Sequence, residues 1–279
     1  MSLPLFMLIV FLVAVVAGAF GAWLGLGGGV FIVPALTLAL GVNVRYAIGA
    51  SIVSVIATSS GSAASYVRSR VTNMRLGMLL EVGTTLGAVV GSVVATQVPV
   101  AALFITFAVV LLYAAAVMLR PVQEHAHLAP ADQRGVARWL GLGGAYHDEA
   151  LGQTVEYGVA HPGLGLAASG VAGAVSGLLG VGGGIIKVPA MDLLMRVPIK
   201  AASATSSFMI GVTAATSAGV YFARGDVHPA LAAPVAAGVL AGTRLGTRLL
   251  VRLRGGTTRR VFAVVLVFTA VQMLLRGLR

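Results

Sequence analysis

Two short stretches of the sequence decide the fold: residues 25–35 read GLGGGVFIVPA, and residues 180–190 read GVGGGIIKVPA. Three glycines occur in succession in both stretches, and each glycine inside a helix costs about 1 kcal/mol relative to alanine. Pro34 and Pro189 follow, and proline cannot donate a backbone hydrogen bond. Both stretches therefore predict a broken helix followed by a short return segment.

The similarity between these stretches extends far beyond them. At an offset of 155 positions, residues 18–91 align without a gap onto residues 173–246, and 22 of the 74 aligned pairs are identical. In so restricted an alphabet, about one pair in ten would match by chance. The chain is therefore expected to hold two homologous membrane repeats, over 1–119 and 162–279, joined by a polar linker over 120–161.

The composition indicates that both repeats lie in a membrane. The 279 residues are 58% hydrophobic and 10% charged, with a mean hydropathy of +0.98, whereas a soluble domain carries about 25% charged residues. This leaves too little polar surface for a water-soluble globule, which excludes an ordinary soluble enzyme and a disordered chain. The absence of cysteine excludes disulfides, thiolate zinc sites and a cysteine nucleophile.

Each repeat is expected to contain four full helices and one short return segment. In the first repeat the helices cover about 3–26, 46–67, 75–97 and 100–119, with the return segment at 30–44. In the second repeat they cover about 163–181, 201–223, 229–251 and 258–277, with the return segment at 185–199. Five passes is an odd number, so the fold class is an all-α polytopic membrane protein whose second repeat is inverted relative to the first.

The basic residues support this topology. The formal net charge is +11, but outside the linker the 16 basic residues cluster at the ends of apolar runs. With the N-terminus outside, and with the three basic residues of the linker counted, thirteen basic residues fall on the inner side and four on the outer side, as the positive-inside rule requires. Lys187 and Arg244 lie within apolar segments and are left out of this count. The linker is then cytoplasmic. Aromatic residues are not interleaved with the basic ones, so nucleic acid is not an expected partner.

The broken glycine clusters are also candidate substrate contacts. Irregular backbone at membrane depth is tolerated only against protein or a water-filled cavity, and the amides at the start of a helix favour anions. The alternative is that only glycine fits at a tightly packed hairpin tip. The candidate residues are Gly27, Gly28, Gly29, Gly182, Gly183 and Gly184.

The long helix after each return segment carries hydroxyl groups on one face. Ser51, Ser54 and Thr58 are spaced by three and four residues, which places them on the same side of a helix. Hydroxyls can donate to an oxyanion and still release it, although hydrogen bonding between helices is an equal alternative. The candidates in the second repeat are Ser203, Thr205, Ser206 and Thr213.

Glycines at every fourth position predict a packing surface. Such a ridge of small residues lets two helices approach closely. It is expected to lie either between the two repeats or between the subunits of a homodimer. The glycines are Gly83, Gly87 and Gly91, with aligned partners Gly238, Gly242 and Gly246.

Few charged residues lie inside the apolar segments, so each is a candidate for function. Lys187 follows the second glycine cluster, where it either attracts an anion or snorkels; Ile32 holds the aligned position in the first repeat. Glu81 couples transport to protons, pairs with Arg75, or caps the structure near the inner surface. Arg244 is either a coupling or gating cation that attracts substrate, or a snorkelling charge.

Motifs for nucleotides, metals and catalysis are missing from the sequence. The glycine clusters do not end in GK[ST], and there is no HExxH motif and no nucleophile elbow. The histidines of the linker fit no standard metal spacing, so a solvated loop is expected there. The chain is therefore expected to bind no cofactor or metal and not to be an enzyme.

The duplicated pattern resembles a known family. The segments GLGGG…VPAL and RYAIGAS (45–51), with their counterparts GVGGG…VPAM and KAASATS (200–206), are similar to those of the TauE/SafE family of membrane transporters, also called the sulfite exporter or TSUP family. The resemblance covers nearly the whole chain. It implies a multi-pass protein of a bacterial or archaeal inner (plasma) membrane that moves small anions such as sulfite, sulfoacetate or related sulfonates.

These observations predict an exporter of small anions that works by alternating access between two inverted repeats. Its expected partners are the small anionic substrate and the lipid bilayer. An importer or channel for similar anions is one alternative, and a non-transporting membrane scaffold is another.

Overall fold

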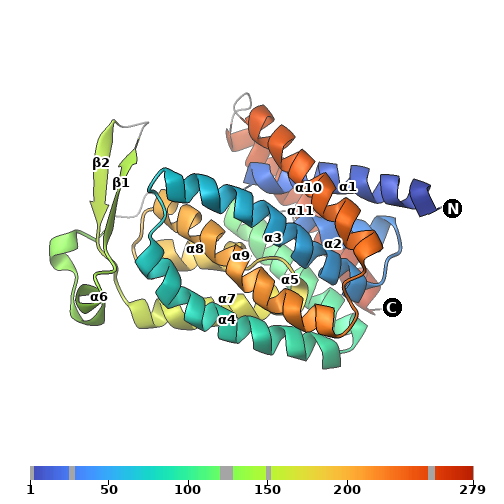
Figure 1. Ribbon diagram of the computed structural model, residues 1–279, viewed down its shortest axis with the longest axis horizontal. Coiled ribbons are helices and arrows are strands. Elements are labelled where there is room, and N and C mark those ends of the chain that lie inside the picture. Colours follow the sequence, from blue (N-terminus) through green and yellow to red (C-terminus); the bar gives the residue numbers. More distant parts are fainter. Residues whose placement is uncertain (1–2, 25–28, 120–127, 149–151, 251–254, 279) are drawn as a thin grey trace.

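The computed structural model describes residues 3–24, 29–119, 128–148, 152–250 and 255–278, and this part of the chain is mostly helical (Figure 1). Before the linker come α1 (Leu3–Leu24), α2 (Gly29–Pro34), the π-helical turn η1 (Ala35–Ala39), α3 (Val44–Arg68), α4 (Met74–Gln97) and α5 (Val100–Leu119). The linker contains the 3-10 turn η2 (Pro130–Asp132), α6 (Gly135–Trp139), β1 (Gly144–Asp148) and β2 (Gln153–Tyr157). After it come α7 (Pro162–Leu179), α8 (Gly184–Leu193), α9 (Ile199–Ala223), α10 (Pro229–Leu250) and α11 (Gly255–Leu278).

Five of the described helices are long and apolar enough to cross a membrane: α3, α4, α5, α7 and α9. Shorter apolar helices lie at Pro4–Ala19, Gly29–Ala39 and Ala263–Leu278. On α4 the exposed apolar side chains recur every fourth residue, at Met78, Val82, Leu86 and Val90. An apolar stripe of this kind suits a helix face that is turned toward lipid.

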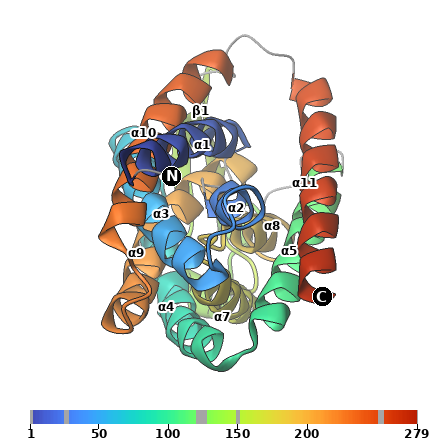
Figure 2. The same ribbon diagram turned by 90° about the vertical axis from the view of Figure 1, so that its right-hand side faces the viewer.

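The long helices pack in pairs that join distant parts of the chain. Helix α4 lies along α7, α1 along α10 and α5 along α11, while α3 packs on α9. Figure 2 shows the short helices α2 and α8 near the centre of the outline, with the longer helices around them. The two segments that follow the glycine clusters therefore lie inside the bundle.

The glycine ridge of α4 packs against α7. A Cβ atom added at Gly87 would lie 2.0 Å from the carbonyl oxygen of Gly170, and one at Gly242 of α10 would lie 2.0 Å from the carbonyl oxygen of Val15 in α1. A side chain does not fit at such a distance, so these positions require glycine. Of the two placements left open by the sequence, the structure confirms packing between helices of one chain.

The second glycine cluster breaks the helix as the sequence predicts. Between α7 and α8 the backbone passes through Gly180, Gly182 and Gly183, whose φ angles are 69°, 83° and 71°. This left-handed conformation costs other residues about 1–2 kcal/mol but is readily adopted by glycine. The corresponding residues 25–28 lie outside the described residues, and α2 begins directly after them at Gly29.

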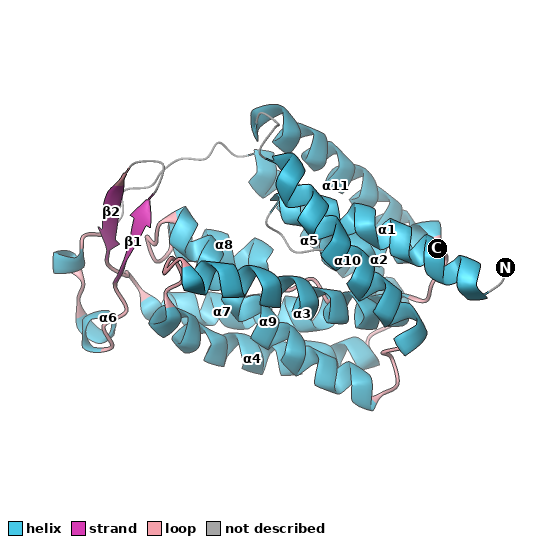
Figure 3. Cartoon of the chain, turned by 45° about the horizontal axis from the view of Figure 1, so that its top comes forward, coloured by secondary structure: helices cyan, strands magenta, loops and turns pink. Residues whose placement is uncertain are grey.

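Part of the linker is folded, and the expectation of a solvated loop is wrong there. Strands β1 and β2 form an antiparallel hairpin in which Gly144 pairs with Tyr157, and Figure 3 shows this hairpin at one end of the helices. Tyr146 and Tyr157 are 7% and 1% exposed, with ring centres 6.3 Å apart. The hairpin hides aromatic surface that an open loop would leave in water.

The folded linker shares a second apolar core with the helices. Leu142 and Tyr157 are buried in one cluster with Leu76 of α4 and Met209 of α9. The side-chain amide of Asn73, just before α4, donates to the carbonyl oxygen of Leu142 at 2.8 Å. Burial raises the pKa of the Tyr157 phenol, so this group stays neutral at physiological pH. The linker therefore covers the N-terminal ends of α4 and α9, and we call this end of the bundle the linker end.

Candidate functional site

Three buried polar side chains meet inside the bundle, and we call them the Lys187 cluster: Lys187 of α8, Thr213 of α9 and Glu81 of α4. Lys187 Nζ donates to Thr213 Oγ1 at 2.9 Å, and Thr213 Oγ1 lies 2.8 Å from Oε1 of Glu81. Their exposed fractions are 1%, 0% and 8%, respectively. Helices from both sides of the linker thus bring together a cation, a hydroxyl and a carboxylate.

The carboxylate of Glu81 is only half satisfied. Its Oε1 atom accepts a hydrogen bond from Thr85 at 3.3 Å, in addition to its contact with Thr213. Its Oε2 atom is buried and has no hydrogen-bond partner among the described residues. The alternative partner, Arg75, donates to the carbonyl oxygen of Gly141 at 3.4 Å. A buried polar atom without a partner costs about 1–3 kcal/mol and more when charged, so Oε2 is suited to bind a proton or a ligand.

The N-terminus of α8 lies beside a second unsatisfied group. The N-cap residue of α8 is Gly183, and within the described part of the chain α8 has no side-chain cap hydrogen bond. Ser206 of α9 is 1% exposed, and its hydroxyl has no partner among the described residues. A Cβ atom at Gly184 would lie 3.5 Å from that hydroxyl oxygen. A helix N-terminus favours anions, and an unpartnered hydroxyl can donate to one.

These groups are close because of the helix geometry. The amide of Lys187 donates to the carbonyl oxygen of Gly183 at 3.1 Å, so Lys187 lies in the first turn of α8. Ser206 and Thr213 are seven residues apart on α9, and two helical turns place them on the same face. The break in the backbone therefore positions a helix start, a hydroxyl and an ammonium along one side of α9.

Ser51 aligns with Ser206 but has different surroundings. Its hydroxyl donates to the carbonyl oxygen of Gly180 at 2.8 Å and lies 3.4 Å from that of Gly29. A Cβ atom at Gly29 would lie 2.7 Å from the same Gly180 oxygen. Ser51 thus ties α3 to the start of α2 and to the break after α7. Its role as a substrate contact stays a prediction.

The other predicted hydroxyls of α3 make local contacts. Ser54 Oγ donates to the carbonyl oxygen of Ser51 at 2.7 Å, and Thr58 Oγ1 donates to that of Ser54 at 3.0 Å. Such back-bonding satisfies a hydroxyl inside an apolar bundle. This is the packing alternative that the sequence left open, and substrate contact at these two residues stays a prediction.

The two predicted hydroxyl residues of α9 nearest the linker end are Ser203 and Thr205. Thr205 Oγ1 accepts a hydrogen bond from the backbone amide of Asn73 at 3.0 Å. Ser203 is half-buried, and its carbonyl oxygen accepts a hydrogen bond from Ser207 at 2.9 Å. Thr205 therefore helps to hold the start of α4, and the binding role of both residues stays a prediction.

Three further predicted residues lie elsewhere. Arg244 is exposed on α10, which packs against α1 and α3, and not on the helices that form the Lys187 cluster. Gly27 and Gly28 lie outside the described residues. A coupling or gating role for Arg244 and substrate contact at the two glycines stay predictions.

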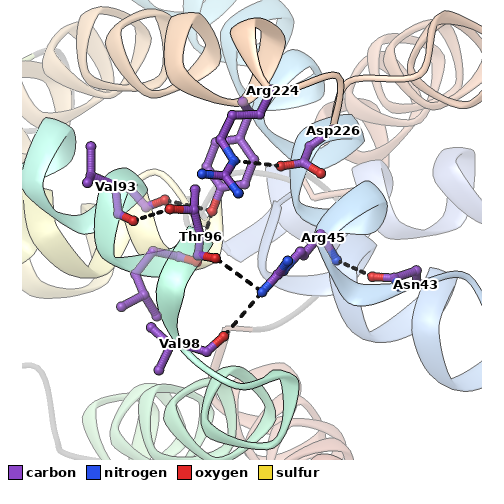
Figure 4. A network of polar contacts seen from close by, with 10 residues as sticks. Asn43, Arg45, Val93, Thr96, Val98, Arg224 and Asp226 are labelled. Atoms are coloured by element: carbon purple, nitrogen blue, oxygen red, sulfur yellow. Dashed lines mark hydrogen bonds and ion pairs between the residues drawn. The ribbon is translucent and has the colours of Figure 1, made fainter.

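Arg45 and Lys200 hold aligned positions and join their helices to other segments at opposite ends of the bundle. Nη2 of Arg45 donates to the carbonyl oxygens of Thr96 and Val98, at the end of α4, both at 3.3 Å (Figure 4). Lys200 Nζ lies 2.6 Å from Oδ2 of Asp148 on β1. These contacts fix the starts of α3 and α9.

Two residues make contacts at the Lys187 cluster or at the linker end without a functional motif that marks them. Thr85 lies four residues after Glu81, which places it on the same helix face. Asn73 caps α4 by accepting a hydrogen bond from the amide of Leu76 at 3.0 Å. Asparagine before an apolar helix is a recognisable N-cap signal, but its contacts with the linker have no such signal.

Known proteins resemble this chain over most of its length. The family model described as "Sulfite exporter TauE/SafE" matches residues 10–273. The chain is 28% identical over 232 residues to the "Probable membrane transporter protein YunE" of Bacillus subtilis (strain 168), a match that covers 79% of this chain and 80% of that protein. No solved structure matches the chain.

Proposed function

The chain belongs to the sulfite exporter TauE/SafE family of multi-pass membrane transporters, and from that premise we propose that it exports small anions. The proposed cargo is sulfite, a sulfonate such as sulfoacetate, or a related sulfur-containing or organic anion. The protein is a transporter and not an enzyme.

The observation that carries the proposal is the burial of Lys187 in a membrane bundle. Its side chain is 1% exposed, with the ammonium on Thr213. Charges inside the membrane are costly and mark substrate or ion pathways. Hydrogen bonds from an ammonium to an oxyanion are among the stronger ones in proteins.

We assign the anion to the donors that lie between the Lys187 ammonium and the start of α8. The donors proposed to hold it are the Lys187 ammonium, the hydroxyls of Ser206 and Thr213, and the amides of Gly182–Gly184. Support comes from the uncapped start of α8 and from the unpartnered hydroxyl of Ser206 among the described residues. The site is closed to solvent in this conformation, so transport requires helices around it to move.

We further propose that α1–α5 and α7–α11 form two repeats of opposite orientation. The packing supports this, because α4 on α7 is matched by α1 on α10, and α4 on α9 by α3 on α10. At the offset of 155 residues, α1 aligns with α7, α3 with α9 and α4 with α10. Each contact between two helices therefore has a counterpart between the two aligned helices. A site where the two groups of helices meet can be opened to one side and then the other by rocking.

The linker end is proposed to face the cytoplasm. Arg68, Arg70 and Arg75 lie at this end, and Arg134 and Arg138 lie in the linker. An excess of basic residues near helix ends is typical of the cytoplasmic side. Export would then carry the anion from the linker end to the end where Arg45 caps α4.

Flux in proteoliposomes tests the proposal. Binding is first screened by thermal shift with sulfite, sulfoacetate, thiosulfate and acetate, and flux of the best binder is then measured under imposed ion gradients. We expect saturable flux that Lys187→Gln abolishes, whereas Lys200→Gln, at the exposed linker end, retains it.

Each other result has a definite meaning. Currents at channel rates would show that the protein is a channel and not a carrier. Flux only in the inward direction would show that it is an importer. No binding and no flux with any of the four anions would contradict the proposed cargo and favour a non-transporting scaffold.

A further inference from the structure

We infer that each monovalent anion bound at Lys187 enters the site together with one proton, which Glu81 takes up. The inference rests on the proposed function, because it concerns the same site. It adds a second cargo, the proton, and makes transport of a monovalent anion electrically neutral.

The charge balance of the Lys187 cluster carries the inference. The cluster holds one ammonium and one carboxylate, and its side chains are at most 8% exposed. An oxyanion that binds Lys187 adds a second negative charge to these surroundings. An uncompensated charge in a buried site is far more costly than a neutral carboxylic acid.

The step balances without an oxidant or a covalent bond to the anion. The starting site is the Glu81 carboxylate with the Lys187 ammonium; it takes up one proton and one anion X⁻. The product is the Glu81 carboxylic acid, with X⁻ held by the ammonium. The only bond formed is the O–H bond of Glu81, and release of X⁻ reverses the step.

The structure provides a place for this proton. Oε2 of Glu81 is buried and without a hydrogen-bond partner among the described residues. Oε1 already lies within hydrogen-bond distance of Thr85 and Thr213. Protonation at Oε2 therefore removes the charge without displacing the groups at Oε1, and the new O–H group can donate to the anion.

Thr213 links the proton to the anion. Its oxygen lies 2.8 Å from Oε1 of Glu81 and 2.8 Å from the carbonyl oxygen of Met209, and it has one hydrogen to donate. The ammonium of Lys187 has three hydrogens, one of which points to Thr213. Once Glu81 is neutral, the threonine hydrogen and the other ammonium hydrogens can turn to the oxyanion.

Other titratable groups on the surrounding helices make contacts elsewhere. Arg75 of α4 and Lys200 of α9 contact the linker. Tyr221 of α9 donates to a backbone carbonyl of α7 at 3.1 Å, and α7 itself carries no titratable side chain. Asp192 of α8 lies about 140° around the helix from the cluster lysine, at about 100° per residue. The carboxylate that faces the ammonium is therefore that of Glu81.

The number of protons bound with an anion tests the inference. Isothermal titration calorimetry is run on the full-length protein in detergent, in two buffers of different ionisation enthalpy, with methanesulfonate, sulfoacetate and thiosulfate as probes. None of these probes takes up a proton near neutral pH. We expect about one proton per bound methanesulfonate, with a Kd that rises about tenfold per pH unit where Glu81 ionises.

Two variants assign the proton. Glu81→Gln should bind methanesulfonate without proton uptake and with a Kd that no longer depends on pH. Glu156→Gln removes a carboxylate from an exposed position on strand β2 and should behave like the unaltered protein. Proton uptake that persists in Glu81→Gln would overturn the assignment.

The outcomes separate the inference from the proposed function. If probes bind to the unaltered protein without proton uptake, the inference is overturned and the proposed function stands. If none of the three probes binds, the inference fails, and the proposed function fails with it when sulfite and acetate do not bind in the thermal-shift screen either. If Glu81→Gln does not fold, the proton count of the unaltered protein decides alone.

Discussion

The short helices α2 and α8 each follow a glycine cluster and lie inside the bundle, but their surroundings differ in chemistry. Ile32 of α2 holds the position that aligns with Lys187, and Ala236 of α10 aligns with Glu81. Ile32 is 1% exposed and belongs to the main apolar core. The glycines and the proline recur in both places, whereas the charges occur in one. The architecture therefore does not depend on the charges, and we attribute the charges to transport.

The aligned serines Ser51 and Ser206 also differ, in whether their hydroxyls have a hydrogen-bond partner. The hydroxyl of Ser51 is held by the carbonyl oxygen of Gly180, whereas that of Ser206 has no partner among the described residues. A polar group that packing alone required would be satisfied by packing. Ser51 fits a structural role, and the unpartnered hydroxyl of Ser206 agrees with our proposal that it donates to the anion.

Replacing Lys187 by the residue of the aligned position should have the largest effect. In Lys187→Ile, the loss of charge-assisted hydrogen bonds of about 1.5–3 kcal/mol should weaken anion binding about ten- to hundredfold. The free energy of unfolding should also fall by about 3–5 kcal/mol, because Glu81 loses its counter-charge. Proteoliposome flux and thermal melting in detergent measure the two effects.

The double variant Lys187→Ile/Glu81→Ala is the control, because it copies Ile32 and Ala236 together. It should melt close to the unaltered protein and still not transport the anion. A double variant as unstable as Lys187→Ile would contradict the charge balance between Lys187 and Glu81.

Thr213→Val should have the next largest effect. It keeps the shape of the side chain but removes the hydroxyl between Lys187 and Glu81, so the Kd of the anion should rise about tenfold, the equivalent of one hydrogen bond of about 1–1.5 kcal/mol. Thr58→Val alters the aligned residue on α3 and should have a smaller effect on the Kd. Equal effects would show that the site extends to both helices.

The aligned serines should respond in opposite ways. Ser51→Ala removes the bond to Gly180 and should lower the free energy of unfolding by about 1 kcal/mol. Ser206→Ala removes an unsatisfied hydroxyl, so it should not lower stability, but it should weaken anion binding severalfold. Melting curves with and without sulfoacetate separate the two, and unchanged ligand stabilisation in Ser206→Ala would remove Ser206 from the site.

The smallest effect is expected at the ends of the bundle. Lys200 is 55% exposed where it pairs with Asp148, and ion pairs with this much solvent contribute about 0–1 kcal/mol. Lys200→Ala should therefore barely change melting but should speed proteolysis of the linker. Arg45→Ala, at the opposite end, should leave the rate of linker cleavage unchanged. If Arg45→Ala raised this rate as much as Lys200→Ala does, cleavage would report general unfolding and not release of the linker.

Much of the helical pattern could be predicted, because glycine, proline and apolar runs act on their own neighbours. The helix expected at 201–223 is α9, which spans Ile199–Ala223. The contact of Glu81 with Lys187 could not be predicted, because it depends on how α4 crosses α8 and α9. The burial of Tyr157 could not be predicted either, since it arises only when the linker docks on the helices.

The pairing of α1 with α10 has a consequence for biosynthesis. The first residue of α10 follows the last residue of α1 by 205 positions (229 − 24). At about 5–20 residues per second of translation, α1 waits roughly 10–40 s in the bilayer before its neighbour leaves the ribosome. Assembly thus has an obligatory order, in which α4 and α7 can close first. In a nascent chain that stops before α10, α1 has no packing partner and is exposed to membrane proteases.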